Sequence, residues 1–217
     1  MNHPHEVTKG LFPGDIVFDI GAHIGDKAAW FAQRGLEVVC VEPQPEMVKQ
    51  LTERFQNTPN VSIKGVGLGS KRGLLQMSIA SKTPTLSTFA PHWKAGRFVN
   101  CEWDSSTNVE IILLDDLVNE FGVPRYCKID VEGYEREVIK GLSQRIGIIS
   151  YEFTNEYMDH ALDVLQSLIK IGYTKFNLSL GEQDHFYFPR WLTYYELAST
   201  LHASRQNVNL WGDVYAN

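Results

Sequence analysis

The chain has 217 residues, of which 43% are hydrophobic and 21% charged, and these values fit one soluble domain with a substantial core. Its formal net charge of -6 argues against nucleic acid or an anionic membrane as the main partner, since both favour basic proteins. The start of the chain has no apolar signal segment, and three cysteines without a C-x-x-C pair favour reduced thiols. We therefore expect one cytoplasmic domain over residues 1–217, with no nucleic acid or membrane partner.

The first part of the chain alternates predicted strands and helices. Residues 15–20 (DIVFDI) form a short apolar run closed by glycine, which predicts a buried strand. Apolar residues at helical spacing follow over 25–34, and a second strand is expected over 37–42. A helix begins near Pro45, and residues 60–69 predict a third strand that runs into a glycine-rich bend.

The rest of the chain continues this alternation around two irregular segments. We expect excursions on the substrate side over 81–108, a candidate lid, and over 181–207, because neither segment shows a clear period. Between and around them, strands are expected over 73–80, 126–130, 146–153 and at the end of the chain, and the clearest amphipathic helix over 158–169.

Strands that alternate with helices predict βαβ units, a mostly parallel sheet and helices on both of its faces. In such sheets the ligand lies beyond the carboxyl ends of the strands. This rule directs attention to residues 21–25, Glu42, 67–70, 130–133 and 152–155.

The segment DIGAHIGD (residues 19–26) predicts a cofactor-binding turn after the first strand. Glycines at 21 and 25 permit a sharp bend, and Glu42 follows 21 positions after Gly21, at the place where a carboxylate can bind ribose hydroxyls. A dinucleotide site favours G-x-G-x-x-G, but His23 stands where the second glycine is expected. Asp19 suits an amino-acid group better than a pyrophosphate. From these residues alone we expect a ribose-containing cofactor.

Four segments together resemble the FkbM family of S-adenosylmethionine-dependent methyltransferases. They are VFDIGAHIGDKAAWFAQRG, VCVEPQPEMVKQL, ILLDDL and KIDVEGYEREVIKGL, and KIDVEGYE is the most specific. The similarity runs from about residue 14 to residue 153, and WGDVYA near the end is similar to the family's last strand.

The resemblance implies a Rossmann-like class I methyltransferase fold. Its sheet has seven mostly parallel strands, and the last strand runs antiparallel between its neighbours. The implied cofactor is S-adenosyl-L-methionine. By position, Glu42 would bind the ribose of the cofactor, and Asp130 would lie near its methyl group. The methionine end would be held by Asp19, Gly21, Ala22 and Gly25. The adenosine would be contacted by Pro43, Gln44, Gly67 and Leu68. We expect His23 to make a supporting contact in the same turn.

Three acids at strand ends are candidates for catalysis: Asp130, Glu132 and Glu152. Neighbouring carboxylates repel each other, and one of them can then keep a raised pKa suited to a general base. Alternatively, the three could hold a divalent ion, or Glu132 could only bind backbone N–H groups of the next turn. We expect base catalysis without a resident metal.

The interpretation we favour is O-methylation of a hydroxyl group on a small molecule or a glycan. Aromatic residues are dense in the two excursions and suit a sugar or another planar ligand. The alternatives are a non-catalytic module that binds S-adenosylmethionine and, less favoured, a nicotinamide-dependent oxidoreductase. The sequence specifies neither the acceptor nor the oligomeric state.

Overall fold

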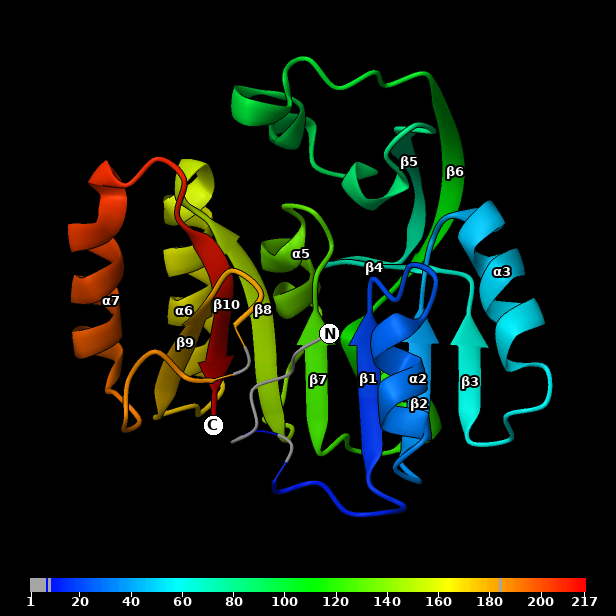
Figure 1. Ribbon diagram of the computed structural model, residues 1–217, viewed down its shortest axis with the longest axis horizontal. Helices are drawn as coiled ribbons and strands as arrows, with labels where there is room; N and C mark the ends of the chain where they lie inside the picture. Colours follow the sequence, from blue (N-terminus) through cyan, green and yellow to red (C-terminus); the bar gives the residue numbers. More distant parts are fainter. Residues whose placement is uncertain (1–6, 8, 184) are drawn as a thin grey trace.

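The computed structural model of the protein describes residues 7, 9–183 and 185–217, and their main feature is a seven-stranded sheet in the order β3-β2-β1-β7-β8-β10-β9 (Figure 1). Its strands are β1 (Ile16–Ile20), β2 (Glu37–Val41), β3 (Val61–Lys64), β7 (Tyr126–Ile129), β8 (Ile148–Thr154), β9 (Phe176–Leu180) and β10 (Trp211–Ala216). The pairs among β3, β2, β1, β7 and β8 are parallel, whereas β10 is antiparallel to both β8 and β9. The expected seven-stranded sheet with its antiparallel last strand is confirmed.

Helices pack on both faces of this sheet. They are α2 (Asp26–Ala32), α3 (Pro45–Phe55), α4 (Leu114–Phe121), α5 (Glu135–Lys140), α6 (Met158–Lys170) and α7 (Tyr194–Ala203). One core contains buried side chains of α2 and α3, and the other contains those of α4 to α7. Val17 and Phe18 are neighbours on β1 but belong to different cores, because successive strand side chains point to opposite faces.

A smaller sheet stands beyond the carboxyl ends of the main strands (Figure 1). It has the order β4-β6-β5 and consists of β4 (Gly67–Leu68), β5 (Gly73–Ile79) and β6 (Ser105–Ile112). Residues 105–108, expected in the first excursion, belong to β6, since they pair with β5 in a register that matches Met77 with Thr107. Their Ser and Thr side chains gave no apolar alternation from which a strand could be predicted.

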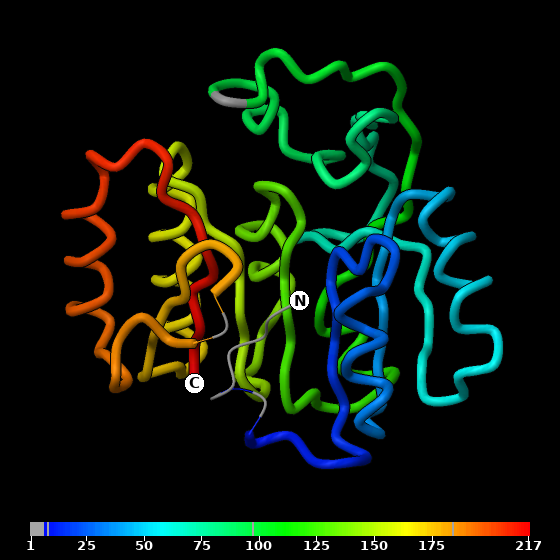
Figure 2. The backbone as a smooth tube through the Cα atoms, viewed as in Figure 1, coloured from blue at the N-terminus to red at the C-terminus, as the bar shows by residue number. Residues whose placement is uncertain are grey.

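The remainder of the first excursion joins β5 to β6 and is visible as the upper green trace in Figure 2. It contains three short 3₁₀ helices, Pro84–Leu86, Pro91–Lys94 and Gly96–Phe98. Side chains tie it to the main body: the Gln44 amide donates to the Pro84 carbonyl at 3.1 Å, and the Thr88 hydroxyl donates to the Glu132 carbonyl at 2.7 Å. Among the described residues, none of the helices combines the length and the apolar composition that a membrane span requires.

Candidate active site

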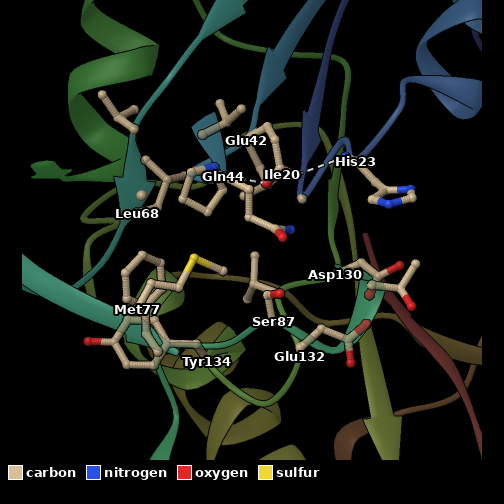
Figure 3. A pocket seen from close by; sticks show the side chains of 18 residues that line it. Ile20, His23, Glu42, Gln44, Leu68, Met77, Ser87, Asp130, Glu132 and Tyr134 are labelled. Atoms are coloured by element: carbon tan, nitrogen blue, oxygen red, sulfur yellow. Dashed lines mark hydrogen bonds between the residues drawn. The ribbon is translucent and has the colours of Figure 1, made fainter. Parts of the chain in front are cut away.

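A pocket lies between the carboxyl edge of the main sheet and the smaller sheet (Figure 3). It has the position that a parallel α/β sheet favours for ligands. The sequence-predicted residues that line it are Gly21, His23, Glu42, Pro43, Gln44, Gly67, Leu68, Asp130 and Glu132. Asp19, Ala22 and Gly25 are not part of this lining. The structure therefore brings together most of the expected cofactor contacts.

The turn after β1 depends on glycine at two positions. Gly21 has φ +80°, and a Cβ there would lie 1.8 Å from the backbone oxygen of Asp130. Gly25 has φ +78°, and a Cβ there would lie 2.5 Å from the Phe55 ring. Gly21 thus lets the ends of β1 and β7 approach, while Gly25 lets α3 pack on the turn. His23 between them also has a positive φ of 50°, which is uncommon for a residue with a side chain.

Asp19 is buried beneath this turn, with 1% of its surface exposed. Neither carboxylate oxygen has a hydrogen-bond partner among the described residues. Burial raises the pKa of this carboxyl, although the charges of Lys128 and Lys27 act in the opposite direction. An unpaired buried carboxylate fits the ammonium group of an amino-acid ligand. This fits the methionine end of the expected cofactor.

Glu42 is fixed at the end of β2 by the backbone around it. Its carboxylate accepts a hydrogen bond from the His23 N–H at 2.8 Å and from the Gln44 N–H at 2.9 Å (Figure 3). Burial raises its pKa, and these two backbone bonds lower it. Because an ionised carboxylate can accept about four hydrogen bonds, Glu42 keeps capacity for the two hydroxyls of a ribose.

Three acids meet where β7 and β8 end. One carboxylate oxygen each of Asp130, Glu132 and Glu152 lies within 4.8 Å of the others. Burial together with the charge of Asp130 raises the pKa of both Glu132 and Glu152 well above the ordinary value. We call these three residues the acid cluster. The spacing would also let one divalent ion contact all three carboxylates, so the structure is compatible with the metal-binding alternative considered from the sequence.

Lys128 sets the charge of this cluster. Its Nζ donates to Oδ2 of Asp130 at 2.8 Å, and its side chain is only 4% exposed. Burial raises the pKa of Asp130, but the positive charges of Lys128 and Lys27 outweigh it and lower that pKa overall. Asp130 is therefore the ionised member, whereas Glu132 and Glu152 tend to keep their protons.

The turn-shaping role considered for Glu132 is performed by Glu135. Its Oε1 accepts the N–H groups of Val131 at 3.0 Å and Gly133 at 3.2 Å. Burial raises the pKa of Glu135 to about 7. Glu132 itself has φ +55° and faces the pocket, so its carboxylate stays directed at the ligand space.

Sequence reasoning missed several residues of the site. Met77, Thr85, Ser87 and Phe89 line the pocket from β5 and the first excursion, and Tyr134 lines it from the turn before α5. The alternation over residues 73–80 predicted a strand, but nothing in the sequence placed Met77 against the cofactor turn. Lys128 could have been found as a lysine inside a predicted buried strand.

The second excursion divides into two parts. Glu182 and Gln183 lie around a polar hollow with Asp130 and Glu152. Further along, α7 packs into the core through Leu197 and Leu201.

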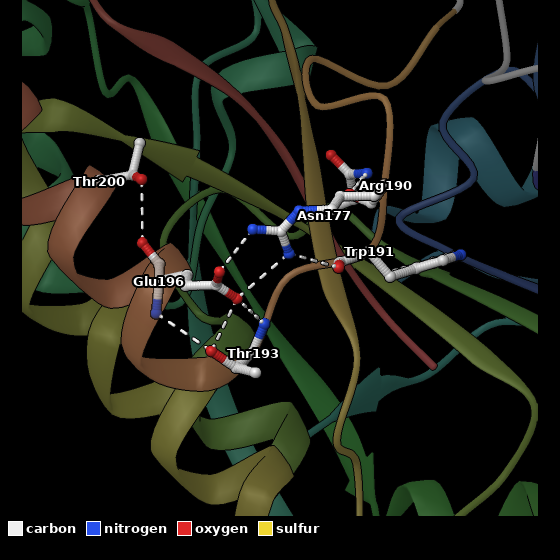
Figure 4. Close-up of polar contacts among 6 residues, drawn as sticks. All are labelled: Asn177, Arg190, Trp191, Thr193, Glu196 and Thr200. Atoms are coloured by element: carbon white, nitrogen blue, oxygen red, sulfur yellow. Dashed lines mark hydrogen bonds and ion pairs between the residues drawn. The ribbon is translucent and has the colours of Figure 1, made fainter.

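The start of α7 is held by a capping box and an ion pair (Figure 4). The Glu196 N–H donates to the Thr193 hydroxyl, and the Glu196 carboxylate accepts the Thr193 N–H at 2.7 Å. The Arg190 guanidinium donates to the same carboxylate at 2.5 Å. These contacts give α7 a structural role at the edge of the sheet.

Comparisons with known proteins agree with this geometry. Residues 19–175 match the model of the methyltransferase FkbM domain. The chain belongs to the FkbM methyltransferase family. This membership confirms the expected cofactor, S-adenosylmethionine, and favours neither the nicotinamide-dependent nor the non-catalytic alternative.

One curated relative and two solved structures add detail. Hexuronic acid methyltransferase AglP of Haloferax volcanii is 27% identical over 140 residues, which cover 63% of this chain and 54% of the relative. The chain thus spans about half the length of that relative. Precorrin-6y C5,15-methyltransferase of Geobacter metallireducens has a TM-score of 0.53 at 10% identity, over 98% of this chain and 83% of its own. This likeness shows the class I methyltransferase fold alone. Magnesium protoporphyrin IX methyltransferase of Synechocystis has a TM-score of 0.49 at 12% identity, over 97% and 74%.

Proposed function

We propose that this FkbM-family protein transfers a methyl group from S-adenosylmethionine to a hydroxyl group of a glycan. The observation that carries the proposal is the acid cluster at the end of the cofactor pocket, where carboxylate oxygens of Asp130, Glu132 and Glu152 lie within 4.8 Å of one another and the pKa of Asp130 is lowered while those of the two glutamates are raised. The curated relative is named as a hexuronic acid methyltransferase, which supports a sugar as the acceptor. A small hydroxylated molecule is the second acceptor class.

The cofactor would be held along the pocket, from the turn after β1 to Leu68. Asp19 and the turn containing Gly21, Ala22, His23 and Gly25 would receive the methionine end, and Glu42 the ribose hydroxyls. Pro43, Gln44, Gly67 and Leu68 would contact the adenosine. When bound, S-adenosylmethionine supplies an electrophilic methyl group on a sulfonium ion.

The protein's own contribution is alignment, exclusion of water and management of one proton. Lys128 keeps Asp130 ionised, so Asp130 can accept the proton of the acceptor hydroxyl. Glu132 and Glu152, with raised pKa values, can hold that hydroxyl by hydrogen bonds. Bound S-adenosylmethionine would supply the methyl group to the hydroxyl oxygen, and its sulfur would keep the electron pair of the broken carbon–sulfur bond. Asp130 then passes the proton to solvent.

We further propose that residues 81–104 act as the cover of the cofactor. Thr85, Ser87 and Phe89 of this segment line the pocket, which supports the idea of a lid. A cytoplasmic location is the accompanying proposal, supported by three unpaired cysteines at positions 40, 101 and 127.

Calorimetric titration with S-adenosylhomocysteine and with NAD tests the cofactor, and a methylation assay on glycans tests the reaction. We expect S-adenosylhomocysteine to bind and Glu42→Ala to abolish binding, because the ribose loses its acceptor. Binding of NAD alone would overturn the proposal. Asp130→Asn should stop methyl transfer while the cofactor still binds, and full activity of that variant would eliminate Asp130 as the base.

A further inference from the structure

Glu132 of the acid cluster has a backbone conformation that its surroundings must maintain. Its φ of +55° and that of Gly133, +88°, both lie in the left-handed region. This region costs a residue with a side chain about 1–2 kcal/mol, so such a conformation persists only where neighbouring groups hold it. Because the backbone limits the rotamers of a side chain, this turn determines which space the Glu132 carboxylate can reach.

Thr88 of the first excursion binds this turn directly. Its hydroxyl donates to the Glu132 carbonyl at 2.7 Å and accepts the Ala90 N–H at 2.8 Å. The residue is only 1% exposed, so solvent does not compete for these bonds. Its own backbone is fixed to β5, because the Thr88 N–H donates to the Ser78 carbonyl at 3.0 Å and the Ser78 N–H donates back at 2.9 Å. Thr88 therefore connects β5 to the backbone of Glu132.

The residues on either side of Thr88 reach the cofactor pocket instead. Ser87 and Phe89 line this pocket, as Glu132 does (Figure 3). Successive side chains of an extended segment point to opposite sides, so one short stretch can contact both the pocket and the turn. The segment that would cover the cofactor therefore also holds the turn that carries Glu132.

A second contact from the same excursion lies next to the Thr88 bond. A Cβ at Gly133 would come within 2.7 Å of the Trp93 indole, so the buried ring packs directly on this glycine. Glu135 binds the N–H groups on either side of Glu132, whereas Thr88 alone binds its carbonyl among the described residues. Moving the excursion away would remove both the hydroxyl and the indole from the turn.

We propose that Thr88 is a positioning residue for methyl transfer, which holds the Glu132 carboxylate toward the ligand space by binding the Glu132 carbonyl. The inference rests on the proposed function, because it assumes that the acid cluster binds the acceptor hydroxyl. Closing the excursion over the cofactor then completes the acid cluster in the same movement. Methyl transfer is favoured only when the cofactor is enclosed.

The first test is amide hydrogen exchange at Val131 and Gly133, measured by NMR with S-adenosylhomocysteine bound. Thr88→Val keeps the shape of the side chain and removes its hydroxyl. It should speed exchange at both amides about tenfold, the effect of one lost hydrogen bond. Thr88→Ser keeps the hydroxyl and should exchange at the wild-type rate.

Tyr157→Phe is the matched control. It removes another hydroxyl that binds the excursion, at the His92 carbonyl and a distance of 2.6 Å, and should leave exchange at Val131 and Gly133 unchanged. Unchanged exchange in Thr88→Val, or equal acceleration in Thr88→Ser or Tyr157→Phe, would overturn the inference. Equal acceleration at the Ser78 amide would also overturn it, because the whole segment would then have left β5.

Methyl transfer to methyl glycosides of glucose, galactose, mannose and glucuronic acid is the second readout. Thr88→Val should lower kcat about tenfold, with the KM for S-adenosylmethionine within about twofold of wild type, and Thr88→Ser should restore kcat. In a Glu132→Gln background, Thr88→Val should cause no further loss, because it acts through that carboxyl. An unchanged kcat, or the same loss in both backgrounds, would show a merely structural role and overturn the inference.

The inference and the proposed function fail in different ways. Failure of the wild-type protein to bind S-adenosylhomocysteine would overturn the proposed function. If S-adenosylhomocysteine binds but no glycoside is methylated, the sugar acceptor is wrong, and the exchange rates at Val131 and Gly133 still support or overturn the role of Thr88.

Discussion

The ammonium group of Lys128 and the carboxylate of Asp130 form a buried ion pair at the carboxyl end of β7, with a distance of 2.8 Å between Nζ and Oδ2. The two residues are separated by Ile129, so their side chains leave the strand on the same face. Asp19 on the neighbouring strand β1 is paired in register with Lys128, and although burial raises the pKa of Asp19, the Lys128 charge acts to lower it. One lysine thus serves both the cofactor side and the acceptor side of the site.

Lys128→Met should destabilise the protein by about 3–5 kcal/mol, because it leaves buried carboxylates without their cation. Urea unfolding measures this loss, and the double variant Lys128→Met/Asp130→Asn should recover part of it. In the single variant, burial raises the pKa of Asp130, so protonation relieves the penalty in acid. The difference from wild type should shrink as the pH falls toward 4. A difference that does not change with pH would contradict this account of the pair.

Asp19→Asn should lower the affinity for S-adenosylhomocysteine by about tenfold to a hundredfold, because an ionic hydrogen bond to the ammonium is lost. 5′-Methylthioadenosine lacks the amino-acid group, so its affinity should not change. Calorimetry with both ligands makes the comparison. The free variant should unfold at the same temperature as wild type or a higher one, since a buried carboxyl without a hydrogen-bond partner has been removed. An equal loss of affinity for both ligands would show that Asp19 only maintains the fold.

Gly21→Ala should destabilise the protein by about 3 kcal/mol or more, because the new Cβ would overlap the Asp130 carbonyl at 1.8 Å as well as strain a residue at φ +80°. Gly172→Ala is the matched control. Gly172 also has a positive φ, of 102°, but a Cβ there meets nothing within 4 Å, so only about 1 kcal/mol is expected. Thermal and urea unfolding compare the two. Similar losses of stability in the two variants would mean that the close approach of the ends of β1 and β7 contributes little to the free energy of unfolding.

Glu135→Gln should change the pH dependence of stability. Burial raises the pKa of Glu135 from 4.5 to about 7, so the folded state holds a proton that the unfolded chain releases near 4.5. Wild-type stability should therefore fall, relative to the variant, as the pH rises from 4.5 to 7, by up to about 3 kcal/mol, and then stay level. The glutamine oxygen can still accept the backbone bonds. Urea unfolding across this range gives the difference.

Glu196→Gln is the control for this prediction. The Arg190 ion pair and the Thr193 contacts lower the pKa of Glu196 to about 2. Its contribution to stability is therefore present above 4.5 and is lost only as the pH falls toward 2. If the free energies of unfolding of wild type and Glu135→Gln change with pH in parallel between pH 4.5 and 7, Glu135 is not protonated in the folded protein.

Local patterns were sufficient to predict the main architecture. The strand over 15–20, the glycine turn, Glu42 at its spacing and the KIDVEGYE segment all lie within short stretches of chain. Period and spacing express such relationships directly, because neighbouring residues on one element are fixed by backbone geometry. The mostly parallel sheet follows from them, whereas the antiparallel last strand and most of the cofactor lining were implied by the resemblance to the FkbM family.

Segments without a period could not be assigned in this way. The first four residues of β6 are Ser and Thr with an Asn, and only their pairing with β5 makes them a strand. Likewise, α7 lies in a segment that we expected to be irregular, and its packing against the sheet depends on Leu197 and Leu201 finding a core built by other elements.

By itself, the sequence determined the fold class, the cofactor and the strand ends at which chemistry is expected. Only the tertiary structure decided that Glu152 of β8 meets Asp130 and Glu132 of the turn after β7. It also showed that Lys128 stabilises the ionised form of Asp130, and that Glu135, not Glu132, accepts the backbone N–H groups of the turn. It also placed Trp93 over Gly133. Glu152 and Trp93 reach this turn from distant parts of the chain, and their positions depend on strand register and packing, which no local pattern encodes. The contacts of Lys128 and Glu135 are local, but they depend on how the chain turns at the end of β7.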